Sequence, residues 1–269
     1  MGQTRDNLSV VAMVCRTSDR NETGAACAKL LAEEIASRAG VQPRVVGTPS
    51  PARDGAWADD LRDCRGCLLE AGGQISDALR AGLRPVMVAA DCSISMTTLR
   101  EVGRERPGAV VLWLDAHADF HSPQSTESGY LGGMCLSAAC GVWEPGLSNA
   151  DPFAPGAVVM AGVRDVDDGE LPAIDVQGIV RAAGTEEVLE EVSDRAVFIH
   201  LDLDVLDPDV LPGAAFPVPG GLDADDLLDL FDAVADEASE IIGIEITGLG
   251  SLDHASLIAD VIAPLLGET

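Results

Sequence analysis

The stretch Ala109–His121 reads AVVLWLDAHADFH, an apolar run that stops at Leu114 and turns at once into a segment with Asp115, His117 and Asp119. Apolar, β-branched runs of this length are typical of buried strands, and open α/β sheets bind ligands at the strand ends. Because side chains alternate along a strand, the two aspartates and the histidine project to the same side. Burying two carboxylates and an imidazole together would be costly without a cation. The stretch therefore predicts a buried strand that leads to a metal site.

Similar apolar runs recur along the chain, with helical patterns between them. Predicted strands cover residues 8–15, 43–47, 84–90, 109–117, 157–164, 177–180, 196–204 and 241–248. Predicted helices cover residues 22–39, 56–82, 95–105, 169–174, 185–193, 222–237 and 252–266. This alternation predicts a parallel sheet with helices on both faces. No linker divides the chain, so we expect one α/β domain over residues 1–269, with irregular stretches at 118–155 and 205–221 after strand ends.

The composition excludes several classes of partner. The formal charge is −28, from 45 acidic and 17 basic residues, and Lys29 is the single lysine. Nucleic acid and anionic membranes require a basic face, so neither is an expected partner. The acidity suits either a surface adapted to high salt or the attraction of a cationic substrate. Self-association is left open by the sequence.

The start of the chain predicts a strand instead of a signal peptide. Its first apolar run, Leu8–Cys15, spans eight residues and follows the acidic Asp6. That run is too short for a membrane span, and no small-residue cleavage site follows it. We therefore expect a cytoplasmic protein.

The cysteines give no sign of a disulfide framework, because seven is an odd number in a chain with a full core. Cys64 and Cys67 form the motif CRGC inside a helical pattern, and no second CxxC or HxxxH completes a zinc site. We expect two ordinary helix residues there. Cys135 and Cys140 are expected to be small buried residues.

A second acidic pair ends the predicted strand 196–204, in FIHLDLDVLDP. Asp202 and Asp204 share a face, and Asp207-Pro208 breaks the strand into a loop. The motif DxD is common in so acidic a chain, so its weight comes from the apolar strand residues before it. Ligands that are mostly carboxylates suit Mn²⁺ or Mg²⁺. The number of candidate ligands favours two ions that share bridging aspartates and activate water.

The order DAHAD, SGYLGGM, RDVDDGE, HLDLDVLDP and GIEITGL, between about Val86 and Gly248, resembles the ureohydrolase family of arginases and agmatinases. The resemblance implies a three-layer α/β/α fold around an eight-stranded, mostly parallel sheet. It also implies a dimanganese centre that hydrolyses a guanidino C–N bond and releases an amine. The substrate would then be a small cationic guanidino compound.

The same resemblance assigns metal-ligand roles by position. Asp115 and Asp202 would bridge two Mn²⁺ ions. His117 and Asp204 would complete one ion, and Asp119 would bind the other.

Three further positions match residues that hold the substrate in the family. Glu245 falls where a carboxylate pairs with the guanidinium. Asp167 matches an arginase residue that contacts the α-amino group, a contact that agmatinases do not need; a surface turn acid is the alternative. Ser128 matches a residue near the α-carboxylate.

The chain also departs from the family. The usual strand-edge motif Gly-Gly-Asp-His reads AADC, so Cys92 takes the place of a metal-ligand histidine. Gly132 stands where arginases carry a histidine that passes protons to the leaving amine, and His121 replaces an asparagine. Proton transfer could instead fall to His121 or His254.

Three roles are open for Cys92: a buried core residue, a nucleophile or a metal ligand. No Cys-His-Asn pattern supports a nucleophile. A thiolate ligand beside the carboxylates is the favoured interpretation, and its softness could shift the metal towards Zn²⁺, Fe²⁺ or Co²⁺.

One branch of the family pairs a metal-ligand cysteine with an LGGM segment and hydrolyses Nω-hydroxy-L-arginine to L-ornithine and hydroxyurea. The resemblance to that branch makes this the expected reaction. A hydroxyguanidine is less basic than a guanidine, and its N–OH brings a proton and a metal-binding oxygen, so a histidine shuttle becomes dispensable. The alternatives are an arginase, an agmatinase or another guanidino or formimino hydrolase, and a non-catalytic metal-binding protein of the same fold.

Overall fold

The sheet at the centre of the computed structural model, which describes residues 7–267, has eight strands, and every neighbouring pair is parallel. The strands are β1 (Leu8–Met13), β2 (Arg44–Val46), β3 (Arg84–Val88), β4 (Val110–Leu114), β5 (Val158–Ala161), β6 (Val180–Ala182), β7 (Ala196–Asp202) and β8 (Glu240–Thr247). Their order across the sheet is β2-β1-β3-β8-β7-β4-β5-β6. The predicted parallel sheet is confirmed.

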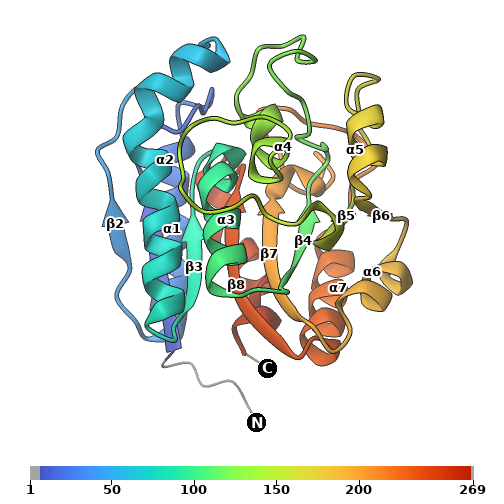
Figure 1. Cartoon of the computed structure of the whole chain (residues 1–269). Helices are drawn as coiled ribbons and strands as arrows, with labels where there is room; N and C mark the ends of the chain where they lie inside the picture. The colour runs from blue at the N-terminus through green and yellow to red at the C-terminus, as the bar shows by residue number, and fades with distance from the viewer. Residues whose placement is uncertain (1–6, 268–269) are drawn as a thin grey trace.

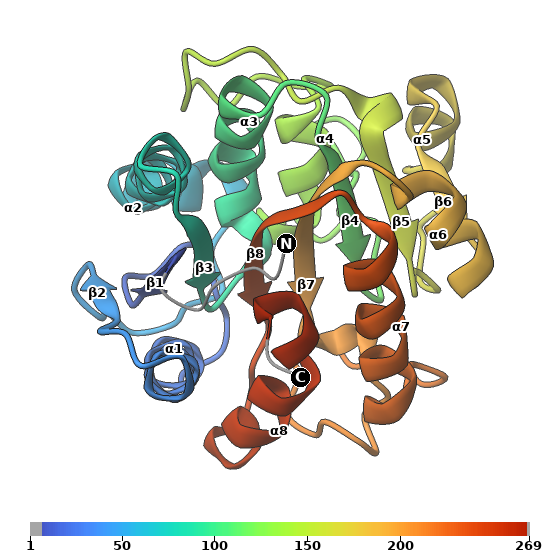
Figure 2. The same ribbon diagram turned by 90° about the horizontal axis from the view of Figure 1, so that it is seen from below.

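Helices cover both faces of this sheet (Figures 1 and 2). They are α1 (Gly24–Ala39), α2 (Trp57–Arg80), α3 (Ser95–Glu105), α4 (Cys135–Ala139), α5 (Leu171–Gln177), α6 (Thr185–Val192), α7 (Ala224–Glu237) and α8 (Ala255–Val261). One apolar core joins the sheet to α1, α6, α7 and α8, and a second joins it to α2, α3, α4 and α5. No helix within residues 7–267 combines the length and apolar content needed to cross a membrane.

Strand β4 shows how the sequence produces these layers. All of its residues are buried. Val111 and Trp113 pack in the core beside α3, while Val110, Leu112 and Leu114 pack in the core beside α7. A strand that is buried on both faces needs an uninterrupted apolar run, and AVVLWL supplies one.

Some predicted element bounds were wrong. Strand β4 ends at Leu114, before Asp115 and His117, which the prediction had included, and β3 ends at Val88, two residues earlier than predicted. The stretch 118–155, predicted to be irregular, contains the short helix α4, whose small residues CLSAA carry no clear helical period. The predicted helix 252–266 is α8 with a 3₁₀ turn on either side. The second turn contains Pro264, which cannot continue an α-helix.

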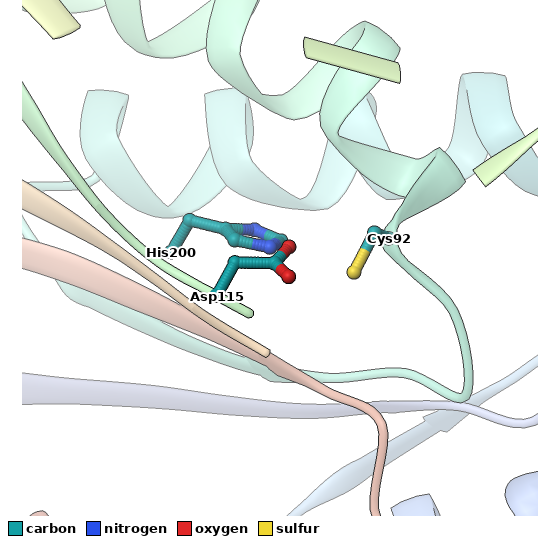
Figure 3. A group of neighbouring side chains, drawn as sticks. All are labelled: Cys92, Asp115 and His200. Atoms are coloured by element: carbon teal, nitrogen blue, oxygen red, sulfur yellow. The ribbon is translucent and has the colours of Figure 1, made fainter. Parts of the chain in front are cut away.

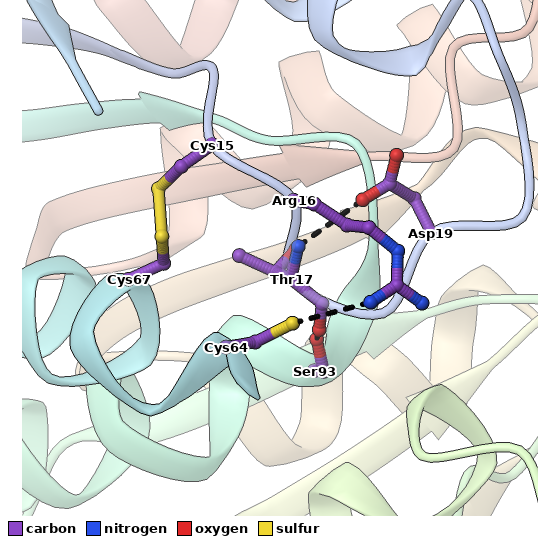
Figure 4. The surroundings of a disulfide bond; sticks show 7 residues. All are labelled: Cys15, Arg16, Thr17, Asp19, Cys64, Cys67 and Ser93. Atoms are coloured by element: carbon purple, nitrogen blue, oxygen red, sulfur yellow. Dashed lines mark hydrogen bonds between the residues drawn. A yellow bond between two sulfur atoms is a disulfide. The ribbon is translucent and has the colours of Figure 1, made fainter. Parts of the chain in front are cut away.

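A disulfide joins Cys15, just after β1, to Cys67 in α2 (Figure 4). Cys64 and Cys67 do lie in a helix as predicted, but the expectation that both are ordinary helix residues was wrong for Cys67. The Arg16 guanidinium lies 3.4 Å from the Cys64 sulfur and 2.9 Å from the buried carboxylate of Asp60. These contacts tie the loop after β1 to α2.

Candidate metal centre and substrate pocket

Three strands, β3, β7 and β4, carry the predicted ligands to one edge of the sheet. Cys92 follows β3, Asp115 follows β4, Asp202 ends β7, and β8 lies between β3 and β7. The carboxyl ends of parallel strands meet at the same edge, and β4 pairs directly with β7. The motifs DAHAD and HLDLD are therefore brought side by side, although many residues separate them in the chain.

Asp115, His117 and Asp204 form one group of possible ligands. The Nδ1 atom of His117 lies 3.4 Å from Asp115 Oδ1 and 3.1 Å from Asp204 Oδ2. The main-chain N–H of His117 donates to Asp115 at 2.7 Å, and that of Ala116 donates to Asp204 at 3.0 Å. One ligand atom from each of the three side chains lies within 4.8 Å of the other two. This spacing suits a divalent cation.

Cys92, Asp115 and His200 form a second group, with ligand atoms that also lie within 4.8 Å of one another (Figure 3). The Cys92 thiol donates to Asp202 Oδ2 at 2.7 Å. Asp115 belongs to both groups, as a bridging ligand would. His200 was not among the predicted site residues, although it precedes Asp202 by two positions and so shares its face of β7.

Asp119 and Asp202 complete the acidic cluster. Asp119 has a left-handed backbone with a φ of 49°, and its carboxylate accepts from the Cys135 thiol at 3.4 Å. The two oxygens of Asp202 accept from the Asp204 main-chain N–H at 2.8 Å and from the Thr247 hydroxyl at 3.2 Å. All five predicted aspartate and histidine ligands thus gather with Cys92 at one sheet edge.

Burying these acidic side chains and the thiol together costs free energy unless a cation is bound among them. Burial, followed by the charge of Asp204, raises the pKa of Asp115 well above its ordinary value. Burial also raises the pKa of Asp202 to about 6 and that of the Cys92 thiol well above its usual range. Burial alone would lower the pKa of His117, but Asp115 and Asp204 raise it to about 12. A bound divalent ion would offset the cost of burying these carboxylates and the thiol together.

Two buried atoms at the centre also lack partners. Within residues 7–267, neither Asp115 Oδ2 nor His200 Nε2 has a hydrogen-bond partner. Leaving a buried polar atom unpaired costs about 1–3 kcal/mol. Free acceptors, carboxylates and a thiol in one place fit a divalent metal centre.

A cavity of about 300 Å³ opens beside this centre. It is lined by His117, Asp119, His121, Ser128, Tyr130, Gly133, Asp165, Asp167, Glu170 and Phe216. A smaller hollow lined by Cys92, Asp202 and Asp204 shares Tyr130 and Phe216 with it. The structure therefore places His121, Ser128 and Asp167 in one pocket with the predicted ligands His117 and Asp119.

His121 lines the pocket and is held by several polar neighbours. Its Nε2 atom lies 2.9 Å from Asp167 Oδ2, and its Nδ1 atom lies 3.2 Å from Ser125 Oγ. Buried Glu170 lies 3.8 Å from the same Nε2 atom and accepts from the main-chain N–H groups of Phe120 at 2.7 Å and Asp167 at 3.0 Å. Glu170 was missed by the sequence analysis, although it closes the motif RDVDDGE.

Tyr130 separates the pocket from the loop after β3. Its hydroxyl donates to Asp91, and its ring lies 4.9 Å from that of Phe216. A Cβ atom on Gly132 would lie 2.6 Å from the Tyr130 ring atom Cε1. A side chain at residue 132 would therefore displace the Tyr130 ring from this position.

Glu245 does not line the pocket. Its side chain is fully buried, and its oxygens accept from Ser95 at 2.6 Å and Thr98 at 2.5 Å, with His200 Nδ1 at 2.8 Å. The predicted contact between Glu245 and a guanidinium would require the carboxylate to leave these partners. His254, the other predicted candidate for proton transfer, lies just before α8 and outside the residues that line the pocket.

Comparison with known proteins identifies the family. The family model described as Arginase family matches residues 55–266, so the chain belongs to the arginase family. A relative from Streptomyces lavendulae, named N(omega)-hydroxy-L-arginine amidinohydrolase, is 34% identical over 260 residues, which cover 93% of either chain. The arginase of Bacillus caldovelox is 32% identical over 212 residues, which cover 72% of this chain and 71% of that protein. The chain is thus a metal-dependent amidinohydrolase, an enzyme that hydrolyses a C–N bond of guanidino compounds.

The fold agrees with that assignment. The solved structure of the Bacillus caldovelox arginase matches with a TM-score of 0.84 and 23% identity, over 97% of this chain and 98% of that one. An arginase from Bacillus cereus gives the same TM-score at 24% identity. The predicted three-layer α/β/α architecture is confirmed.

Proposed function

We propose that this enzyme hydrolyses Nω-hydroxy-L-arginine to L-ornithine and hydroxyurea at a centre of two Mn²⁺ ions. The observation that carries the proposal is the buried Cys92 thiol in the ligand cluster, where the family usually has a histidine. The relative named N(omega)-hydroxy-L-arginine amidinohydrolase, which aligns with 93% of this chain, supports the same substrate.

Two ligand groups that share Asp115 support two metal positions. Asp115 and Asp202 would bridge the ions, His117 and Asp204 would complete one, and Asp119 and Cys92 would complete the other. The predominance of carboxylate oxygens favours Mn²⁺ over softer ions. When bound, the metals would activate water for attack on the guanidino carbon.

The pocket residues orient an α-amino acid with its guanidino end towards the metals. Asp167 and Asp119 both line the cavity. Asp167 would hold the α-amino group, while the Ser128 hydroxyl would meet the α-carboxylate. Agmatine, which keeps the amine but lacks the α-carboxylate, would leave the Ser128 hydroxyl without this partner.

The pocket also bears on proton transfer. With Tyr130 covering Gly132, the family's shuttle histidine has no room in this arrangement. A hydroxyguanidine brings its own acidic N–OH group to the reaction. His121, which lines the cavity and is held by Asp167, would hold or pass the remaining proton beside the leaving amine.

Steady-state assays of the Mn²⁺-loaded enzyme with three substrates test this proposal. We expect the highest kcat/KM with Nω-hydroxy-L-arginine, a lower value with L-arginine and the lowest with agmatine. An equal or higher value with L-arginine would reject the hydroxyarginine assignment and favour an ordinary arginase. Absence of turnover with every substrate, despite bound Mn²⁺, would instead favour a non-catalytic protein.

A further inference from the structure

His200 occupies a central position that the proposed reaction does not use. It lies in β7, where its register partners are Trp113 in β4 and Glu245 in β8. The side chain is fully buried, and its ring stacks on the Trp113 ring with centroids 3.6 Å apart. The three strands therefore hold the imidazole rigidly on the face of the sheet that carries Asp115 and Asp202.

Glu245 sets the orientation of the imidazole. Its Oε1 atom lies 2.8 Å from His200 Nδ1 and also accepts from the Ser95 hydroxyl. The Thr98 hydroxyl donates to the other carboxylate oxygen. Because a carboxylate oxygen accepts, Nδ1 carries the proton and Nε2 presents a lone pair.

Within the described residues, Nε2 is free of the contacts that occupy Nδ1. No hydrogen-bond partner for it, or for Asp115 Oδ2, exists within residues 7–267. Ligand atoms of His200, Asp115 and Cys92 lie within 4.8 Å of one another, and Figure 3 shows the three side chains converging. An imidazole that donates one nitrogen to a carboxylate and leaves the other free is the usual arrangement of a metal-bound histidine.

We propose that His200 is a metal ligand, which binds through Nε2 the ion that Cys92 and Asp115 hold. This inference rests on the two-metal centre of the proposed function. It gives that ion an imidazole although Cys92 has replaced the histidine at the strand edge. It also makes Glu245 a positioning residue that orients the ligand His200 instead of a residue that contacts the substrate.

Pulsed EPR of bound Mn²⁺ tests the assignment. The protein would be labelled with [¹⁵N]histidine and would carry the substitution His117→Asp, which removes the other imidazole of the cluster and keeps an oxygen ligand. His117 is partly exposed, so this variant spares the buried core. We expect ¹⁵N hyperfine coupling to persist in His117→Asp and to vanish in the double variant with His200→Gln.

Metal content gives a second measurement. His200→Gln should weaken Mn²⁺ binding at one of the two positions by at least about tenfold, and Glu245→Gln should weaken it by about 10–100-fold, as loss of an orienting partner does. The control His254→Gln, outside the pocket, should keep the wild-type content.

The outcomes separate this inference from the proposed function. Bound Mn²⁺ without ¹⁵N coupling in His117→Asp would overturn the assignment of His200 alone. A wild-type protein that binds no Mn²⁺ would contradict the two-metal centre and the His200 ligand with it. Coupling without turnover of hydroxyarginine would support the ligand and reject only the proposed substrate.

Discussion

The main chain of Gly248, just after β8, packs directly against the carboxylate of Asp202 at the end of β7. Gly248 has a φ of 79°, in the left-handed region that favours glycine, and an added Cβ atom would collide with Asp202 Oδ1. The orientation of a predicted bridging ligand therefore depends on a residue that cannot itself bind metal.

Gly248→Ala should weaken Mn²⁺ binding by about tenfold or more, because the new methyl group displaces the Asp202 carboxylate. Gly220→Ala is the matched control, since Gly220 has a similar φ of 83° but no atom within 4 Å of an added Cβ. Metal titration by calorimetry measures the difference. A Gly248→Ala protein that binds Mn²⁺ as tightly as Gly220→Ala would contradict the dependence of metal binding on this contact.

Gly132→Ala should lower the free energy of unfolding by about 1–3 kcal/mol, because the methyl group overlaps the Tyr130 ring. The neighbouring substitution Gly133→Ala is the control, since its Cβ would meet only Asp119 Oδ1, at 3.9 Å. Urea unfolding of both variants checks this expectation. A Gly132→Ala protein as stable as Gly133→Ala would mean that Tyr130 moves aside easily, and space for a shuttle histidine would then exist.

Asp167→Asn should raise KM for L-arginine and Nω-hydroxy-L-arginine by about tenfold, the scale expected for a lost hydrogen bond to a charged group. 5-Guanidinopentanoate keeps the carboxylate but has no α-amino group, so its KM should change much less. The adjacent exposed Asp168→Asn provides the control. An equal rise in KM for all three substrates would place the effect of Asp167 on His121 and not on the α-amino group.

The metal-free protein should lose stability as the pH rises from about 4 to about 6. Burial and then the charge of Asp91 raise the pKa of Asp19 from 3.8 to about 6, so in this range the folded state binds more protons than the unfolded state. Asp19→Asn should reduce this loss by about 1–3 kcal/mol. Urea unfolding at pH 5 and pH 7 measures it, with exposed Asp175→Asn as the control. An unchanged pH dependence in Asp19→Asn would contradict the assignment.

Much of the fold could be predicted from the sequence because its signals are local. The run AVVLWL predicts β4 without reference to any other segment. The shared direction of Asp115, His117 and Asp119 follows from side-chain alternation. The parallel sheet then brings HLDLD to the same edge. These features can be recognised without knowing which strands pair.

The remaining features depend on contacts between distant segments. The environment of His200 is defined by its register with Trp113 and Glu245, which no local pattern reveals. The same register holds the Glu245 carboxylate away from the pocket. The disulfide between Cys15 and Cys67 requires the loop after β1 to lie against α2, a proximity that cysteine spacing alone cannot supply.

A competition assay tests the central claim most directly. The Mn²⁺-loaded enzyme receives equal concentrations of L-arginine and Nω-hydroxy-L-arginine, and urea and hydroxyurea are quantified together, so their initial ratio equals the ratio of the two kcat/KM values. We expect hydroxyurea to exceed urea by at least about tenfold, which corresponds to about 1.4 kcal/mol in transition-state binding. Urea equal to or in excess of hydroxyurea would contradict it.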